Sequence, residues 1–146
     1  SILSQSCTNY KFIIIDDAST ENRWEIIEEY AKKDPRIVAV KNTENLKICK
    51  TLNRGIEMAK GKYIARMDSD DICLPDRFEK QVQFLDGNPE VGIVGGSIQI
   101  MDENGITYSK REYNLTDEKI REKIFRYSPF CHPAVMIRNE ILLKSG

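Results

Sequence analysis

One stretch of six residues indicates how this chain folds: Phe12-Ile13-Ile14-Ile15-Asp16-Asp17. Its first four residues are apolar and mostly β-branched, without polar alternation, which is typical of a strand buried on both faces of a sheet. Two carboxylates follow at the point where that strand ends. Because ligands of open α/β sheets bind beyond the carboxyl ends of the strands, the stretch also predicts which edge carries a site.

Strand and helix patterns alternate on both sides of this stretch. Further strands are predicted at 36–40, 63–67, 91–101, 106–108 and 134–138, with a hairpin at Asn104-Gly105. Helices are predicted from a cap at Ser19 or Thr20 to before Asp34, at 46–58, from Pro75 to about 86, at 116–126, and at the end of the chain before Gly146; residues 1–6 read as a last helical turn. This alternation predicts one α/β domain over residues 1–146, with a mostly parallel sheet and helices on both faces.

Composition narrows the class of protein. The chain has 146 residues, 31% of them charged, and a net charge of -1, which argues against general binding to nucleic acid. No run of 18 apolar residues is present, so we expect no transmembrane segment. The four cysteines lie far apart, which favours reduced thiols and a cytoplasmic location, in the parent protein also at the inner face of the membrane; two disulfides are the alternative.

A second acidic cluster, Asp68-Ser69-Asp70-Asp71, follows the strand predicted at 63–67. Aspartate also favours turns and helix N-caps, and either cluster alone would fit that explanation equally well. Together they place up to five carboxylates at one sheet edge, where like charges need a compensating cation. Oxygen ligands suit Mg²⁺ or Mn²⁺, and Ile72 stands where a calcium loop needs a ligand. We therefore predict a divalent metal that bridges to a diphosphate.

Five segments, in the order in which they occur, resemble glycosyltransferase family 2. They are residues 1–6 (S-I-L-S-Q-S), 12–21 (F-I-I-I-D-D-A-S-T-E), 45–46 with 52–55 (N-L and L-N-R-G), 61–71 (G-K-Y-I-A-R-M-D-S-D-D) and 75–78 (P-D-R-F). The resemblance implies a GT-A, Rossmann-like nucleotide-diphospho-sugar transferase fold. It also implies a chain truncated at both ends, because the family's opening strand would precede Ser1 and its catalytic base would follow Gly146.

The resemblance implies a role for each acidic residue. Asp17 is expected to contact the uracil or nucleoside, with Asp16 supporting the loop. Asp68 is expected to face the ribose and the metal shell, and Asp70 to bind the metal directly. Asp71 is expected to be either a helix N-cap or a partner of a metal ligand.

Basic residues of the same segments are further candidates. Arg77 would support the acidic loop through a charge-assisted hydrogen bond, or else be a solvated helix charge. His132 resembles a family histidine near the acceptor, although a structural histidine is the favoured interpretation. Lys47 replaces the family's usual glycine, so the loop there could differ in shape, and Lys47 or Lys50 could reach a phosphate. Ala18 replaces another glycine, which should be tolerated unless the backbone needs a positive φ.

The activity implied for the parent protein is inverting transfer of a sugar from a nucleotide sugar, with a UDP-sugar expected, to an acceptor hydroxyl of a glycan or lipid-linked glycan in polysaccharide biosynthesis. Residues 1–146 contain no residue that fits the catalytic base, so we expect this piece alone to be inactive. A strand missing from the sheet would leave an edge open to pairing, for example in a homodimer. Two alternatives are a two-component receiver domain, which also has Asp-Asp after its first strand, and a non-catalytic nucleotide-sugar-binding module.

Overall fold

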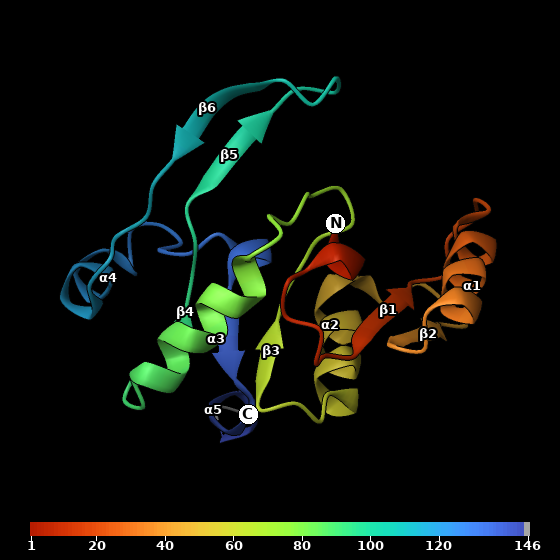
Figure 1. The fold of residues 1–146 in the computed structure, drawn as a ribbon, viewed down its shortest axis with the longest axis horizontal. Coiled ribbons are helices and arrows are strands. Elements are labelled where there is room, and N and C mark those ends of the chain that lie inside the picture. The colour runs from red at the N-terminus through yellow and green to blue at the C-terminus, as the bar shows by residue number, and fades with distance from the viewer. Residues whose placement is uncertain (145–146) are drawn as a thin grey trace.

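The computed structural model describes residues 1–144 and has the α/β architecture expected from the sequence (Figure 1). Its elements are η1 (Ile2–Ser4), β1 (Phe12–Asp16), α1 (Arg23–Lys33), β2 (Ile37–Lys41), α2 (Lys47–Met58), β3 (Tyr63–Ala65), α3 (Arg77–Gly87), β4 (Ile93–Val94), β5 (Ile98–Met101), β6 (Thr107–Arg111), α4 (Asp117–Lys123), η2 (His132–Ala134), β7 (Met136–Arg138) and α5 (Asn139–Lys144).

The strands form three hydrogen-bonded groups. β1 pairs with β2 in parallel, with Phe12 opposite Ile37 and Asp16 opposite Lys41. β7 lies between β3 and β4 and is antiparallel to both, so β3 and β4 run in the same direction. β5 and β6 form an antiparallel hairpin that projects from the body of the molecule (Figure 1). Helices α1 and α2 pack against β1, α3 against β4, and α5 against β7.

The expectation that residues 12–15 are buried on both faces is wrong, because all four are only half-buried. Within residues 1–144, β1 is hydrogen-bonded along one edge only, to β2, and β3 along one edge only, to β7. A strand without a second neighbour leaves its side chains and one row of backbone groups less covered. The apolar run therefore has the composition of an interior strand and the surroundings of an edge strand.

The core lies between α3 and the sheet that contains β7. Leu85 is fully buried, and Phe78 and Met136 pack with it. Arg138 is also buried, and its guanidinium donates hydrogen bonds to the carbonyl oxygens of Val91 at 2.8 Å and of Leu85 at 2.5 Å. Since buried polar groups are stable only when they are paired, these bonds fix the end of α3 against β7.

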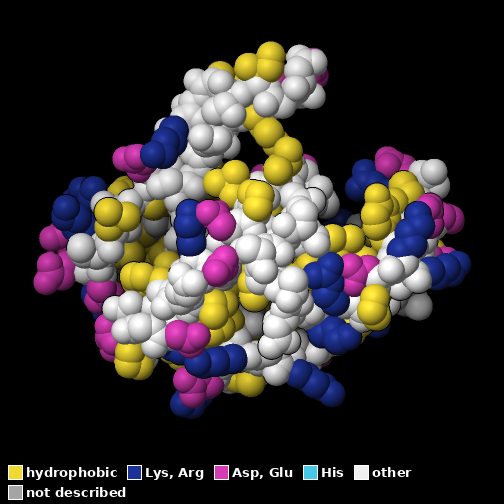
Figure 2. All heavy atoms as spheres, viewed as in Figure 1, with side chains coloured by type: hydrophobic (Ala, Val, Ile, Leu, Met, Phe, Trp, Pro, Cys, Tyr) yellow, Lys and Arg dark blue, Asp and Glu magenta, His cyan; other side chains and the backbone are white. Residues whose placement is uncertain are grey.

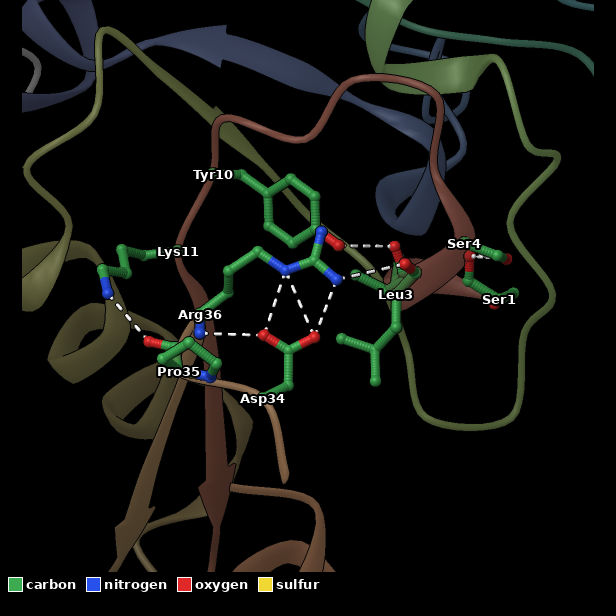
Figure 3. A network of polar contacts seen from close by, with 9 residues as sticks. Ser1, Leu3, Ser4, Tyr10, Lys11, Asp34, Pro35 and Arg36 are labelled. Atoms are coloured by element: carbon green, nitrogen blue, oxygen red, sulfur yellow. Dashed lines mark hydrogen bonds and ion pairs between the residues drawn. The ribbon is translucent and has the colours of Figure 1, made fainter. Parts of the chain in front are cut away.

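A polar network ties the N-terminal segment to the turn before β2 (Figure 3). The Arg36 guanidinium donates to an Asp34 carboxylate oxygen at 2.7 Å and to the Leu3 carbonyl at 3.2 Å, and it lies 4.7 Å from the centre of the Tyr10 ring. The hydrogen bonds from Arg36 lower the pKa of the Asp34 carboxyl to about 2. Residues 1–6 are thereby held against the body as η1, where the sequence predicts a helical turn.

Two predicted helix starts are wrong by two or three residues. α1 begins at Arg23, with Asn22 rather than Ser19 or Thr20 at its N-cap, because the Asp16 carboxylate accepts a hydrogen bond from the Ser19 backbone N–H and holds that segment as a turn. α3 begins at Arg77, two residues after Pro75. The Pro75 carbonyl instead accepts a hydrogen bond from the Ser6 N–H at 2.8 Å, which keeps that residue in the loop.

The strand predicted at 91–101 is divided into β4 and β5 by Gly95 and Gly96. A Cβ at Gly95 would lie 2.8 Å from the Phe130 ring, so the chain passes too close to that ring for a larger residue. The hairpin at Asn104-Gly105 is confirmed, with Gly105 at a φ of 79°. α4 ends at Lys123, earlier than predicted, and the predicted helix stop at Gly146 lies outside the described residues.

All four cysteines are free thiols. None of the helices in residues 1–144 is both long enough and apolar enough to cross a membrane. On the face shown in Figure 2, basic and acidic side chains are interspersed, in keeping with the small net charge of the chain.

Candidate functional site

Asp17 lies at the carboxyl end of β1 and fixes the start of α2. Its carboxylate accepts hydrogen bonds from the Asn42 side chain at 2.7 Å and from the backbone N–H groups of Leu46 at 2.8 Å and Lys47 at 3.0 Å. The Asn42 bond, followed by the Leu46 bond, lowers the pKa of Asp17, so the carboxylate is ionised. It satisfies N–H groups that have no partner within the helix, as an N-cap would, from 30 residues away in the chain.

Asp16 is buried and points back into its own loop. Both of its carboxylate oxygens lie within 3.4 Å of the Ser19 N–H, and its carbonyl accepts a hydrogen bond from the Asn42 N–H at 2.8 Å. The two adjacent carboxylates therefore serve different segments: Asp16 shapes the turn after β1, and Asp17 reaches across to α2.

Both residues that replace family glycines have left-handed backbones. Ala18 has a φ of 57° and Lys47 a φ of 66°, and no other residue besides glycine within 1–144 has a positive φ. Glycine adopts this conformation at little cost, whereas a Cβ makes it unfavourable by about 1–2 kcal/mol. The loop at Lys47 thus keeps a shape that suits glycine, and the positive φ that would make Ala18 costly is present.

The acidic loop after β3 brings three carboxylates together. Asp68 forms an ion pair with Arg66 at 3.0 Å. The pKa of Asp71 is raised, first because neighbouring atoms exclude water and then because the charges of Asp70 and Asp68 lie nearby. The Asp70 side chain is exposed and has no hydrogen bond or ion pair to any residue in 1–144. The Asp71 side chain is also exposed and without a hydrogen bond or ion pair in residues 1–144, so Asp70 and Asp71 are both free to bind an external cation.

Arg77 is half-buried, and its guanidinium is hydrogen-bonded to the protein, though to no carboxylate of the acidic loop. Its guanidinium donates to the carbonyl oxygens of Arg66 at 2.9 Å and Val135 at 3.0 Å, and to the Gln81 side chain at 3.0 Å. These bonds join the end of β3, the start of β7 and the first turn of α3. The alternative of a solvated helix charge does not describe this residue, and its donors are directed to the protein rather than outward.

The described residues contain no group of three or more acidic, histidine or cysteine side chains that could hold a metal by themselves. This geometry fits a cation that takes only part of its ligands from protein. Mg²⁺ and Mn²⁺ commonly bind through one or two carboxylates plus phosphate oxygens. The free Asp70 and the mutual repulsion within the loop supply the oxygen donors and the negative field that such an ion needs.

A pocket of about 610 Å³ opens beside Asp68. Residues of α2 form one wall, among them Ile48 and Leu52, and the segment from Ser128 to Pro133 forms another. Asp17 bonds the backbone at the start of α2, next to Ile48 of this wall, but of the predicted acidic residues only Asp68 lines the pocket itself. His132 lines the pocket and lies 3.4 Å from the Ser128 hydroxyl. Lys50 is not among the residues that line it.

Sequence reasoning assigned no role to two residues of this region. Asn42 is buried, and it bonds both Asp17 and Arg54. Arg66 pairs with Asp68 and lines the pocket. Asn42 follows directly after β2, so the rule that polar residues at strand ends form sites could have found it. Arg66 lies within the strand predicted at 63–67, and no neighbouring residue in the sequence indicates that it belongs to a site.

The model of the family described as "Glycosyl transferase family 2" matches residues 1–145. The chain belongs to glycosyltransferase family 2. Among its relatives, an uncharacterised glycosyltransferase of Methanocaldococcus jannaschii is 35% identical over 99% of this chain and 50% of its own length. The putative glycosyltransferase EpsE of Bacillus subtilis is 37% identical over 94% of this chain and 49% of its own length. The chain thus spans about half the length of the curated relatives it matches.

A solved structure shares the fold. The mannosyltransferase PcManGT of Pyrobaculum calidifontis, in complex with GDP-mannose and Mn²⁺, superposes with a TM-score of 0.71 over 99% of this chain and 40% of its own, at 18% identity. The GT-A type of α/β fold predicted from the sequence is confirmed, and so is the family. The receiver-domain alternative is wrong, because family membership extends over the whole described chain.

Proposed function

We propose that the protein of which this chain forms part transfers a sugar, with inversion, from a nucleoside diphosphate sugar to an acceptor hydroxyl, and that residues 1–144 bind the nucleotide sugar with a divalent metal. One observation carries the proposal: the loop after β3 crowds three carboxylates, of which Asp68 lines a pocket and Asp70 and Asp71 have no side-chain partner in residues 1–144. Family membership supports the transfer reaction, and the solved relative binds GDP-mannose with Mn²⁺.

Each residue of the site has a task in this proposal. Asp70 binds Mn²⁺ or Mg²⁺, with Asp68 facing the ribose and the metal shell and Asp71 beside them. Asp17 holds the start of α2 and contacts the nucleoside from the same loop, and Asp16 shapes that loop. When bound, the cation neutralises the charge that develops on the diphosphate as the sugar departs.

Two basic residues, Arg77 and Lys47, complete the proposed donor site. Arg77 keeps the acidic loop in place through its bonds to Arg66 and Val135. The Lys47 side chain is exposed at the start of α2 and reaches a phosphate of the donor.

The carboxylate that deprotonates the acceptor hydroxyl lies outside these residues, and the donor base is uracil. The relatives include the amylovoran biosynthesis glycosyltransferase AmsE of Erwinia amylovora, which supports a role in biosynthesis. We place the acceptor of this protein among glycans or lipid-linked glycans of polysaccharide synthesis, and the reaction in the cytoplasm or at the inner face of the membrane.

Calorimetric titration of the protein with UDP and with GDP, each with and without Mn²⁺, tests the proposal. We expect Mn²⁺ to tighten binding of UDP at least tenfold, and Asp70→Asn to remove that gain. The control is Asp117→Asn, which removes an exposed carboxylate of α4 that pairs with Arg121 and should leave nucleotide binding unchanged. Nucleotide binding that ignores both Mn²⁺ and Asp70→Asn would overturn the proposed metal site.

The non-catalytic alternative makes a different prediction in the same protein. A binding module would bind the nucleotide and metal yet release no nucleotide from its sugar conjugate. Release of UDP or GDP from a panel of nucleotide sugars in the presence of acceptor glycans therefore separates the two.

We also propose that the free edges of β1 and β3 are where a further strand or a second copy of the chain pairs. A protein that remains monomeric at all concentrations in analytical ultracentrifugation would exclude the homodimer.

A further inference from the structure

The pocket beside Asp68 continues into a second one. The second pocket, of about 320 Å³, extends toward α4, and Arg111 and Tyr113 line both. Together they make a groove that leads from the acidic loop, past the end of β6, to Lys123 and Tyr127. We call this second pocket the outer pocket.

Aromatic side chains recur along the groove. Phe130 lines the part near Asp68, Tyr113 lines both parts, and Tyr127 lines the outer pocket. Aromatic rings offer flat apolar faces that pack well against the C–H faces of sugar rings, while tyrosine hydroxyls serve as hydrogen-bond partners. Asn114 and Ser128 add polar groups to the same walls. A groove of this composition suits a saccharide better than a purely apolar ligand.

The outer pocket has a surplus of positive charge. Arg111 and Lys123 both line it, and neither has an ion pair with a carboxylate in residues 1–144. Glu112 also lines it, but its carboxylate is paired with Lys110 at 2.6 Å. The pKa of Tyr127 is lowered, first by the hydrogen bond from Asn114 and then by Lys123 and Arg111, as expected in a positive field. Arg111 lies 5.2 Å from the centre of the Tyr113 ring, but neither cation has a carboxylate partner in residues 1–144, so this concave site favours an anionic ligand group.

We propose that this groove binds the acceptor and that the acceptor is an acidic saccharide, whose carboxylate or phosphate is bound by Arg111 and Lys123 in the outer pocket. The inference rests on the proposed function, because an acceptor exists only if the protein transfers a sugar. The acceptor then lies on the side of the groove away from the nucleotide. Asp68 does not line the outer pocket, so the anionic group lies where the acidic loop repels it least. The sugar rings then extend along Tyr113 toward the metal site.

Saccharide binding to the full protein, measured by calorimetry and saturation-transfer NMR, tests the inference. The probes are digalacturonic acid for a carboxylate, glucose 6-phosphate for a phosphate, cellobiose as a neutral sugar, and inorganic phosphate. We expect one acidic sugar to bind at least tenfold more tightly than cellobiose, and the better of the two identifies the anionic group. Equal binding of cellobiose, equal binding of inorganic phosphate, or no binding of either acidic sugar at millimolar concentration would overturn the inference.

Variants locate the effect in the groove. The pair Arg111→Gln and Lys123→Gln, combined in one protein, should weaken the acidic sugar at least tenfold and leave cellobiose within twofold. Lys119→Gln is the matched control: it removes the same charge from exposed α4, but Lys119 lines neither pocket and has no ion pair in residues 1–144. An equal loss in the control, or no loss in the double variant, would contradict the assignment. Circular dichroism of each variant verifies that it is folded.

The same samples separate this inference from the proposed function. If Mn²⁺ and Asp70 still govern nucleotide binding while acidic sugars show no preference, only the acceptor assignment fails. If nucleotide binding ignores Asp70, the proposed function fails, whatever the sugars do.

Discussion

Replacing Ala18 and Lys47 by glycine should stabilise the fold, although glycine usually destabilises a protein. Both residues have positive φ angles, 57° and 66°, which an L-residue adopts at a cost of about 1–2 kcal/mol. Glycine removes that cost but gives the unfolded chain more freedom, which offsets about 0.4–1 kcal/mol at each position. We therefore expect each substitution to raise the free energy of unfolding by about 0.5–1 kcal/mol.

The two effects should be nearly additive. Lys47 makes no side-chain ion pair in residues 1–144, so Lys47→Gly removes a strained backbone and little else. Asp17 connects the two positions, because it precedes Ala18 and accepts a hydrogen bond from the Lys47 N–H at 3.0 Å. A small interaction energy between the two substitutions is therefore expected. For a chain of this size, a gain of about 1–2 kcal/mol in the double variant corresponds to a rise in Tm of about 2–8 °C.

Urea-induced equilibrium unfolding, followed by circular dichroism, measures these free energies. The matched control is Ala31→Gly, the same chemical change in the last turn of α1, where it should lower the free energy of unfolding by up to about 1 kcal/mol. Opposite signs for Ala18→Gly and Ala31→Gly are the expected result. If both variants lose stability to the same extent, the backbone at Ala18 is not left-handed in the folded protein and the reasoning is refuted.

Three further substitutions test the packing and the ion pairs. Leu85→Ala should lower the free energy of unfolding in urea by about 2–5 kcal/mol, because the Leu85 side chain is fully buried and its removal leaves a cavity; a loss under 1 kcal/mol would mean that α3 is loosely packed. The pKa of the Asp34 carboxyl is lowered to about 2, so its contribution to the free energy of unfolding is fully present above the unfolded value of 3.8 and is lost as pH falls through about 2. Asp34→Asn should therefore flatten the decline in Tm between these two pH values. An unchanged decline in Tm would contradict this reasoning. Arg77→Gln should cost about 1–3 kcal/mol by leaving the Arg66 and Val135 carbonyls unpaired, and should weaken Mn²⁺-dependent nucleotide binding, whereas a change in nucleotide binding without any loss of stability would indicate direct contact with the ligand.

The sequence alone determined the features that depend on neighbours along the chain. The apolar run at Phe12 predicts β1, the Asn104-Gly105 pair predicts the hairpin, and the spacing of apolar residues predicts α2 almost to its ends. These features follow from strand and helix periodicity and from turn chemistry, all of which act over a few residues. The acidic loop is predicted in the same way, because its residues are adjacent in the chain.

Only the tertiary structure decided which distant groups meet. β7 enters between β3 and β4 as an antiparallel strand, a pairing that spans about half the chain and leaves no local mark. Asp17 is turned toward the start of α2, and Arg77 toward Val135 rather than solvent. The positive φ of Ala18 depends on the turn that the Asp16 carboxylate holds. Hydrogen-bond partners far apart in sequence are chosen by the packed fold as a whole, because a buried polar group must bond to whatever the topology brings beside it.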